Sequence, residues 1–279
     1  MRIDRLLHSG TTFITSTYNG RQLGSATGFF YSELEGPPNY AGGEPGWKTV
    51  KDTWLLTNRH VVLPRELGGE RFPDVLTFRF RTLTDQVEWT EVHLSREQLR
   101  DCAKVHQHPD IDIAALRISD KAIPSDVQDA PPLILQSATN HDLLLPGNPI
   151  EVAVGSDVLI AGYPHGFYDL TSTHPVVKAG VVASGWRLPW QGLPRFLIDA
   201  RLFPGSSGSI VITKPQQFAV REGQMLFSPE PLVALLGIYS GAVVWHGATD
   251  TLDLGVVWYA ELIPECIETG SLPPQALTE

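Results

Sequence analysis

The sequence predicts an all-β protein, and three observations support this prediction. Short runs of apolar and β-branched residues recur along the chain, separated by turn-forming residues. The 25 glycines and 22 prolines are scattered between these runs, which is typical of many tight turns. Only residues 96–103 and 260–269 have helical features, and the first of them follows a capping-box pattern, Ser95-Arg-Glu-Gln98. Many short strands with few helices favour paired β-barrels or sandwiches.

The expected strands fall into two groups on either side of a proline-rich segment. The first group comprises residues 11–17, 25–31, 53–62, 74–83, 87–94 and 111–118. The second group comprises residues 157–163, 176–184, 196–202, 209–213, 232–244 and 254–259. Residues 34–47 predict a loop, and the polar residues 214–230 predict a surface insertion. We therefore expect an N-terminal domain over residues 1–125, a linker over 126–150 and a C-terminal domain over 151–279.

Composition argues against several classes of partner. The formal net charge of −10 disfavours nucleic acid, because phosphate binding depends on lysine and arginine. The sequence contains no run of about 18 apolar residues, so we expect no membrane span. Residues 1–8 contain no continuous apolar core, so we expect no secretory signal. The two cysteines, Cys102 and Cys266, favour a reducing compartment, and we expect a cytoplasmic protein.

The turn at residues 203–209, Phe-Pro-Gly-Ser-Ser-Gly-Ser, is the strongest candidate for a functional site. It lies between two apolar runs that predict strands. Gly205 and Gly208 permit backbone conformations that a Cβ would block. They also leave the amides of Gly205 and Ser207 free to converge on one point. A serine hydroxyl beside convergent N–H donors is the outline of an acyl-transfer site. Taken alone, the pattern also fits an ordinary surface turn.

A serine nucleophile needs a base within hydrogen-bond reach, and the base needs an orienting carboxylate. Among nine histidines, His60 stands at the end of an apolar run, and Asp112 opens another such run. A charge at the edge of a buried strand needs a hydrogen bond, which an imidazole N–H can donate. Each residue also has an ordinary interpretation: single histidines are usually surface or core residues, and Asp112 could cap a turn or pair with Arg117. Asp110 is an alternative orienting acid.

Three sequence motifs occur in the order His, Asp, Ser. They are Thr57-Asn-Arg-His60-Val61, Asp112-Ile-Ala-Ala-Leu116 and Asp199-Ala-Arg-Leu-Phe-Pro-Gly-Ser-Ser-Gly-Ser209, with fainter matches at 26–30, 161–166, 180–184 and 235–240. Together they resemble the trypsin-like serine peptidases of the chymotrypsin fold, and the similarity is greatest to the bacterial HtrA/Deg branch. The resemblance implies two perpendicular six-stranded antiparallel β-barrels, followed by a short C-terminal helix.

The same resemblance implies a role for each site residue. Ser207 corresponds to the nucleophile, His60 to the general base and acid, and Asp112 to the carboxylate that fixes the imidazole tautomer. The amides of Gly205 and Ser207 correspond to the oxyanion hole, and Ser240 to a residue that hydrogen-bonds the triad aspartate. The implied function is a serine endopeptidase that cleaves protein or peptide substrates through an acyl-enzyme, with no cofactor and no metal.

The resemblance also implies a substrate pocket, in which Gly241 and Ala242 contribute backbone. Arg201 stands where the fold often places the base of the primary pocket, and a cation there would favour an acidic substrate residue. The alternative, which we favour, is that Arg201 points away or pairs with Asp199, so that Leu202 lines an apolar pocket. Buried unpaired cations are rare, which supports the second interpretation.

Two departures from the family pattern affect regulation. Secreted trypsins have an aspartate before the nucleophile, and its carboxylate holds the ammonium group that cleavage frees. This chain has Ser206 there, so we expect activity without N-terminal processing. Only 20 residues follow Tyr259, so no PDZ domain is expected. A regulatory protein partner is a further expectation, because a cytosolic protease must be restrained.

Rival interpretations differ in the chemistry that they assign. An α/β-hydrolase would have a helix after the nucleophile and its histidine last, whereas strand-like residues 210–212 follow here. Ser206 and Ser209 are alternative nucleophiles without the Gly-x-Ser-Gly setting. His106 and His108 could meet at a metal but lack a second ligand pair, so we treat them as surface residues. The main rival is a protease-fold binding or regulatory module with an occluded active site.

Overall fold

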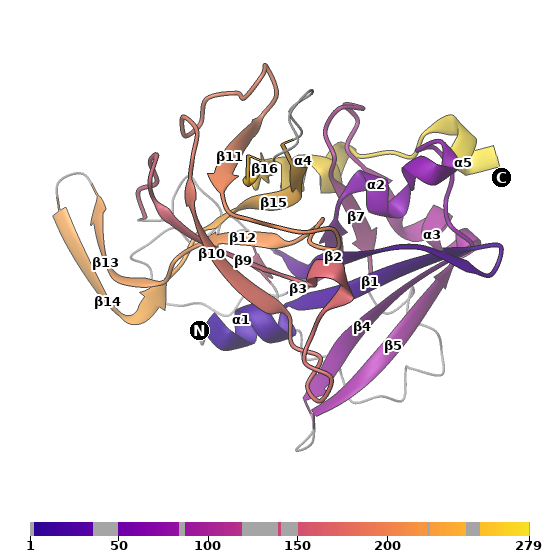
Figure 1. The fold of residues 1–279 in the computed structure, drawn as a ribbon, viewed down its shortest axis with the longest axis horizontal. Coiled ribbons are helices and arrows are strands. Elements are labelled where there is room, and N and C mark those ends of the chain that lie inside the picture. The colour runs from indigo at the N-terminus through magenta and orange to yellow at the C-terminus, as the bar shows by residue number, and fades with distance from the viewer. Residues whose placement is uncertain are drawn as a thin grey trace.

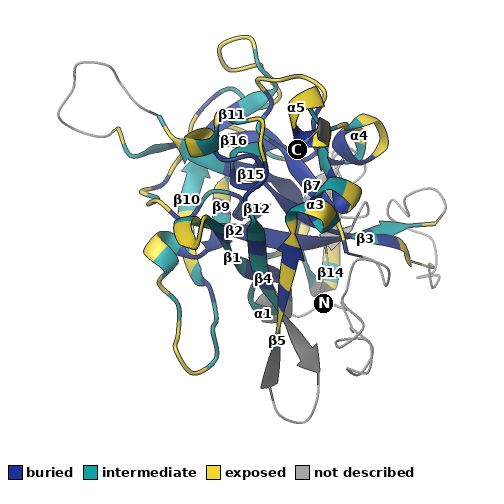
Figure 2. Ribbon diagram, turned by 90° about the vertical axis from the view of Figure 1, so that its right-hand side faces the viewer, coloured by how far each residue is buried: buried dark blue, intermediate teal, exposed yellow. Residues whose placement is uncertain are grey.

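The computed structural model describes residues 3–35, 50–83, 87–118, 139–140, 150–221, 224–243 and 252–278. Two main β-sheets dominate this part of the chain (Figure 1). Buried residues follow the strands of both sheets, whereas exposed residues concentrate in loops and on the outer faces of helices (Figure 2). The predicted all-β, chymotrypsin-like fold class is confirmed. No described helix is long and apolar enough to cross a membrane.

The N-terminal sheet has eight strands rather than the six expected. Their order is β5-β4-β1-β2-β3-β7-β6, and β8 pairs with β2. Their bounds are Thr11–Tyr18 (β1), Arg21–Leu34 (β2), Val50–Thr57 (β3), Val75–Leu83 (β4), Val87–Ser95 (β5), Ala103–Val105 (β6), Ala114–Arg117 (β7) and Thr139–Asn140 (β8). β1 and β2 form a hairpin around Asn19 and Gly20, whose positive φ angles of 50° and 72° match a twisted two-residue turn.

The C-terminal sheet is a closed barrel of six strands, in the order β10-β11-β16-β15-β12-β9. Its strands are Asp157–Gly162 (β9), Val176–Val182 (β10), Arg195–Asp199 (β11), Ile210–Thr213 (β12), Leu235–Ala242 (β15) and Leu254–Tyr259 (β16). Closure gives each strand a neighbour on both sides, although β12 pairs with β15 only as far as Ile238. The expected polar insertion is a hairpin, β13 (Gln216–Arg221) and β14 (Gln224–Leu232), which projects from the barrel (Figure 1).

The helices are short, and the sequence predicted two of them. These are α3 (Arg96–Cys102), which has the expected capping box between Ser95 and Gln98, and α4 (Leu262–Thr269). The sequence did not predict α1 (Ile3–Ser9), α2 (Arg59–Val62), α5 (Pro274–Thr278) or the 3₁₀ turns η1 (Arg65–Leu67) and η3 (Pro164–Gly166). The expected strand at 53–62 ends at Thr57, and the expected strand at 111–118 is β7 alone. His60 therefore lies in a helical turn, and Asp112 precedes its strand.

Two of the expected irregular segments fall mostly outside the described residues. The structure describes only residues 34–35 of the loop expected at 34–47. In the linker expected at 126–150, it describes residues 139–140 and Ile150. Residues 139–140 form β8, which pairs with β2 in parallel. This part of the expected linker thus belongs to the N-terminal sheet.

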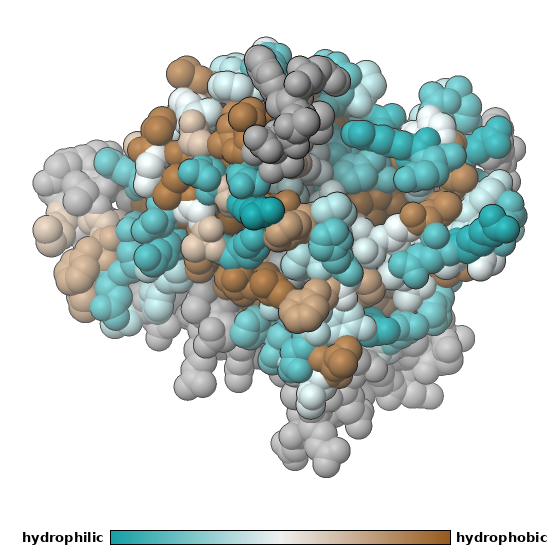
Figure 3. All heavy atoms as spheres, in the orientation of Figure 1, coloured by the Kyte–Doolittle hydropathy of each residue, from teal (hydrophilic) through white to brown (hydrophobic). Residues whose placement is uncertain are grey.

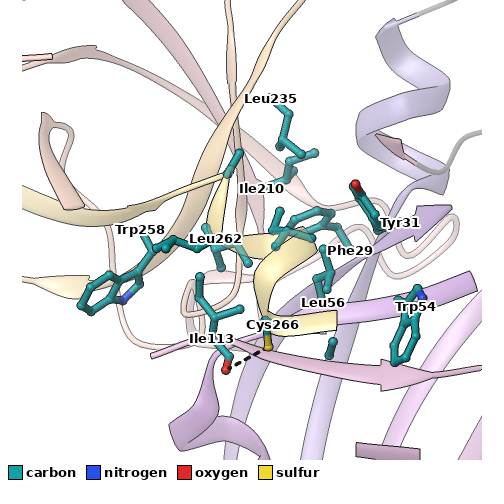
Figure 4. Close-up of a cluster of buried hydrophobic side chains, with 14 of the residues drawn as sticks. Phe29, Tyr31, Trp54, Leu56, Ile113, Ile210, Leu235, Trp258, Leu262 and Cys266 are labelled. Carbon is teal, nitrogen blue, oxygen red and sulfur yellow. Dashed lines mark hydrogen bonds between the residues drawn. The ribbon is translucent and has the colours of Figure 1, made fainter. Parts of the chain in front are cut away.

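A buried apolar cluster contains residues from both sheets and from two helices (Figure 4). Phe29 and Leu56 come from the N-terminal sheet, and Ile210 and Leu235 come from the barrel. The cluster also includes side chains of α1 and α4. Ile111 and Ile113, on either side of Asp112, are 5% and 0% exposed and belong to the same cluster. This packing holds the segment around Asp112 where the two halves of the molecule meet.

Candidate active site

His60 and Asp112 form the first part of the site. The Nδ1 atom of His60 lies 2.7 Å from Oδ2 of Asp112, and the backbone N–H of His60 donates to Oδ1 at 2.9 Å. The buried Asn58 donates its amide Nδ2–H to the backbone carbonyl of Asp112 at 2.8 Å. The segment after β3 is therefore tied to the segment before β7 at three points. These contacts fix both the position and the orientation of the imidazole ring.

Ser240 extends this arrangement into the C-terminal barrel. Its hydroxyl donates to Oδ2 of Asp112 at 2.6 Å. Burial disfavours the carboxylate, but the hydrogen bonds from His60 and Ser240 outweigh burial and hold the pKa of Asp112 below its usual value. Asp112 is therefore an anion near neutral pH, as an orienting group for an imidazole must be.

The turn between β11 and β12 carries Ser207, which is partly exposed. Gly205 and Gly208 have φ angles of 92° and 85°, in the left-handed region that favours glycine. A Cβ on Gly208 would lie 1.9 Å from the carbonyl oxygen of Thr27, and one on Gly205 would lie 2.5 Å from that of Tyr163. Both positions thus require glycine for conformation and for space.

The amides of Gly205 and Ser207 donate no hydrogen bond to any described residue. The carbonyl groups around them are already engaged. The backbone N–H of His165 donates to Pro204 at 2.6 Å, and that of Thr27 donates to Ser207 at 2.8 Å. The arrangement leaves two N–H donors without a described partner in the turn that carries Ser207.

Thr27, on β2, contacts most parts of the turn and is fully buried. Its hydroxyl donates to the carbonyl of Gly205 at 2.9 Å and accepts the N–H of Tyr163 at 3.0 Å. Its own carbonyl accepts the hydroxyl of Thr57 at 2.8 Å. Because Thr57 ends the strand that leads to His60, Thr27 connects the imidazole side of the site to the turn. The sequence analysis assigned no role to Thr27 or to Asn58. Each lies within a matched motif, but nothing in the pattern shows their hydrogen bonds.

The hydroxyl of Ser207 donates to the backbone carbonyl of Ser240 at 3.0 Å. It makes no hydrogen bond to His60 within the described part of the chain. Ser240 is thus bonded to Asp112 through its side chain and to Ser207 through its backbone. Hydrogen bonds between catalytic groups are often long or poorly aligned when no substrate is bound, so the missing bond does not argue against a pairing of Ser207 with His60.

Two cavities border His60. The smaller, of about 150 Å³, lies against β1 and β2. The larger, of about 320 Å³, lies against β15 and is lined by Arg65, Glu66, Arg195, Ser240, Gly241, Ala242 and Val256. The predicted pocket residues divide here, because Gly241 and Ala242 line the larger cavity whereas Arg201 and Leu202 are not among its lining residues. Arg201 is 69% exposed and lies 3.7 Å from Asp253, not Asp199.

The alternative residues occupy different surroundings. Ser206 and Ser209 are 2% and 0% exposed, which keeps their hydroxyls from a substrate. Asp110 is exposed, and its backbone N–H donates to His108 at 3.3 Å. His106 is buried rather than on the surface, and it accepts the N–H of His108 at 3.1 Å. Among the described residues, no group of three His, Cys, Asp or Glu side chains is placed to hold a metal ion.

The fold and these contacts define a protein of the serine-protease class. A family model of the trypsin-like peptidase domain matches residues 26–219. The chain belongs to this family and is a serine protease, a hydrolase that acts on peptide bonds. The match extends from β2 into β13, so it includes all three sequence motifs.

Solved structures with a similar fold share little sequence with this chain. The scabies mite inactivated protease paralogue S-I1 has a TM-score of 0.50 at 16% identity, over 95% of this chain and 98% of that one. The protease Anisep from Arthrobacter nicotinovorans has a TM-score of 0.48 at 12% identity, over 91% of each chain. A serine endoprotease from Yersinia pestis has a TM-score of 0.45 at 14% identity, over 95% of this chain and 64% of that one. A search of curated proteins finds no match.

Proposed function

We propose that this protein is a serine endopeptidase in which Ser207 is the nucleophile, His60 the general base and acid, and Asp112 the carboxylate that orients the imidazole. The observation that carries the proposal is the double contact of Ser240, which bonds Asp112 at 2.6 Å and accepts the hydroxyl of Ser207 at 3.0 Å. One residue of β15 thus links the nucleophile to the base and its carboxylate. The unengaged amides of Gly205 and Ser207 support an oxyanion hole at the same point.

The reaction follows from this geometry. The Oγ atom of Ser207 attacks the scissile carbonyl carbon while its proton passes to Nε2 of His60, and the carbonyl oxygen becomes an oxyanion beside the two amides. Collapse of this intermediate breaks the C–N bond, and the imidazolium gives its proton to the leaving amine. Water then gives a proton to His60 as it attacks the acyl carbon; the C–Oγ bond breaks, the acid leaves, and the imidazolium returns the proton to Ser207. Asp112 stays ionised and stabilises the imidazolium in both steps.

A binding or regulatory module with an occluded site is the alternative function. An occluded site would leave no space beside the histidine. The cavity of about 320 Å³ that borders both His60 and β15 favours the enzyme. Gly241 and Ala242 line this cavity, and we assign them to the acyl side of the substrate. Arg201 and, in the favoured alternative, Leu202 were the other expected pocket residues; neither lines this cavity, and we leave both out of the proposed site.

The test is covalent labelling with a fluorophosphonate, with the modified residue located by mass spectrometry. We expect a single adduct on Ser207, and we expect Ser207→Ala to lose both the label and peptide hydrolysis. The loss in turnover should be on the order of a million-fold, as for other triad nucleophiles. Ser206→Ala is the matched control, because it changes the preceding serine of the same turn. An adduct on Ser206 or Ser209, or unchanged cleavage by Ser207→Ala, would overturn the assignment.

The remaining parts of the proposal concern organisation, compartment and partners. We propose a division into residues 1–125 and 151–279, supported by the two separate sheets, with a connecting segment 126–150 of which residues 139–140 pair with β2. The substrates are proteins or peptides, and a regulatory protein partner belongs to the proposal. We propose a cytoplasmic location because both cysteines, Cys102 and Cys266, are free and buried, as expected of thiols in a reducing compartment.

A further inference from the structure

The larger cavity beside His60 is lined by more positive than negative side chains, although the protein has a formal net charge of −10. Its charged lining residues are Arg65 and Arg195, opposed by Glu66. Arg65 and Glu66 are exposed, so water screens both of them. Arg195 is only partly exposed, at the start of β11. The chemistry of the cavity therefore depends most on the charge of Arg195.

Arg195 is held in place by neutral groups. Its Nη2 donates to Oε1 of Gln191 at 2.9 Å, its Nε donates to the carbonyl of Trp190 at 3.4 Å, and its guanidinium lies 5.5 Å from the centre of the Trp258 ring. No carboxylate of the described residues forms an ion pair with it. Burial lowers the pKa of Arg195, and the nearby charge of Asp110 only partly opposes this effect. A fixed, partly desolvated cation that no described carboxylate pairs with is suited to bind an anionic ligand group.

The backbone next to this cavity is suited to bind an extended peptide. The pairing of β15 with β16 is irregular between Tyr239 and Gly241, so Ser240 lies outside the ladder. The side of Gly241 where a Cβ would project is open space, with no atom within 4 Å. A substrate strand laid along Ser240–Ala242 can form main-chain hydrogen bonds there, and its side chains then enter the cavity.

We propose that Arg195 selects substrates with an aspartate or glutamate on the acyl side of the scissile bond. This inference rests on the proposed function, because the acyl side of the scissile bond is defined by the attack of Ser207. It assigns the recognition of a carboxylate to Arg195 in place of Arg201. Arg201 already has Asp253 at 3.7 Å and its guanidinium lies 5.6 Å from the centre of the Phe203 ring. An acidic side chain in the cavity would give Arg195 the paired anion that the described part of the chain does not supply.

The experiment compares binding of Glu- and Gln-containing peptides to the full chain carrying Ser207→Ala, so that hydrolysis plays no part. A positional-scanning set of fluorescent hexapeptides is titrated at fixed salt, and the ratio of dissociation constants is measured at each position. We expect tighter binding of Glu at one acyl-side position, and we expect Arg195→Gln to reduce this preference about three- to fivefold, as for a partly solvated ion pair. Arg201→Gln is the matched control, because it changes the net charge equally and should leave the preference intact. Glu66→Gln should increase it.

Two results would overturn the inference: an unchanged Glu-to-Gln ratio in Arg195→Gln, or an equal fall in Arg201→Gln, which would indicate only a general charge effect. Fluorophosphonate labelling of the unmodified protein separates this outcome from failure of the proposed function. A labelled Ser207 with no acidic preference refutes the role of Arg195 alone. If Ser207 is not labelled but the preference for Glu depends on Arg195, the proposed nucleophile is refuted and the proposed binding of an acidic side chain stands.

Discussion

Thr27→Val tests whether strand β2 holds the turn at residues 203–209, which carries the proposed oxyanion hole. Valine has nearly the shape of threonine but lacks the hydroxyl, so the change removes two hydrogen bonds and little packing. The carbonyl of Gly205 loses its donor at 2.9 Å, and the N–H of Tyr163 loses its acceptor at 3.0 Å. Both groups belong to buried residues, so water cannot replace the lost partner.

The magnitude follows from these two groups. A buried polar group without a partner costs about 1–3 kcal/mol, so we expect Thr27→Val to lower the free energy of unfolding by roughly 2–6 kcal/mol. The released carbonyl of Gly205 also lets the turn rotate, which moves one of the two amides away from the oxyanion. Loss of one such donor lowers kcat by about a hundred- to a thousand-fold, and we expect a fall of at least tenfold here.

The assay measures kcat and KM separately, together with urea unfolding. We expect kcat to fall while KM changes little, because the amides act mainly on the transition state. Thr27→Ser is the control: it keeps the hydroxyl and removes one methyl group, which costs about 1 kcal/mol of stability. It should restore most of kcat. If Thr27→Val loses stability but keeps the kcat of the unmodified protein, Thr27 supports the fold only and the reasoning is refuted.

Three further predictions concern charge in the site. Ser240→Ala removes a hydrogen bond that keeps the pKa of Asp112 low, so that pKa should rise; NMR titration of the Asp112 carboxyl carbon measures it, and an unmoved pKa argues against the contact. Because the folded pKa of Asp112 is depressed, its stabilising effect is complete above the unfolded value of about 3.9 and is lost as pH falls through the folded value. Melting temperatures between about pH 6 and pH 2 should therefore fall more steeply for the unmodified protein than for Asp112→Asn. Ser206→Asp places a carboxylate at a position 2% exposed, and should cost about 3 kcal/mol or more in urea unfolding, whereas Ser206→Asn should cost less.

Local sequence patterns correctly predicted the helices and strands that depend only on residues next to one another in the sequence. The capping box at Ser95 needs only four consecutive residues, and both of its hydrogen bonds form. The strands of the closed barrel have apolar runs with turn residues at each end, and all six were expected. The strand expected at 53–62 extends too far, because the apolar run continues through Val61 and Val62 although these residues pack in the helical turn α2. Periodicity does not distinguish these two cases in so short a run.

The geometry of the site could not be predicted from any single segment of the sequence. The pattern around Asp112 indicated a buried carboxylate, but its contacts with Asn58 and Ser240 join residues 54 and 128 positions apart. The spacing of Arg201 before Ser207 allowed it at the base of the pocket, but the favoured expectation was that it points away or pairs with Asp199. In the structure Arg201 is 69% exposed and lies near Asp253 rather than Asp199. Spacing indicates which strand a residue occupies, whereas the direction of its side chain depends on partners across the barrel.

The hydrogen bonds of the turn explain why an uncharged residue can stand before the proposed nucleophile. An oxyanion hole requires the carbonyl groups of the turn to face away from it. Here His165 holds the carbonyl of Pro204, and Thr27 holds the carbonyls of Gly205 and Ser207. These donors lie on η3 and β2, and none of them is an ionised group. Backbone and hydroxyl donors therefore hold these three carbonyls of the turn. His165 has a φ of 52°, which is unusual for a residue other than glycine. This strained residue is the one whose backbone N–H holds the carbonyl of Pro204 in the turn.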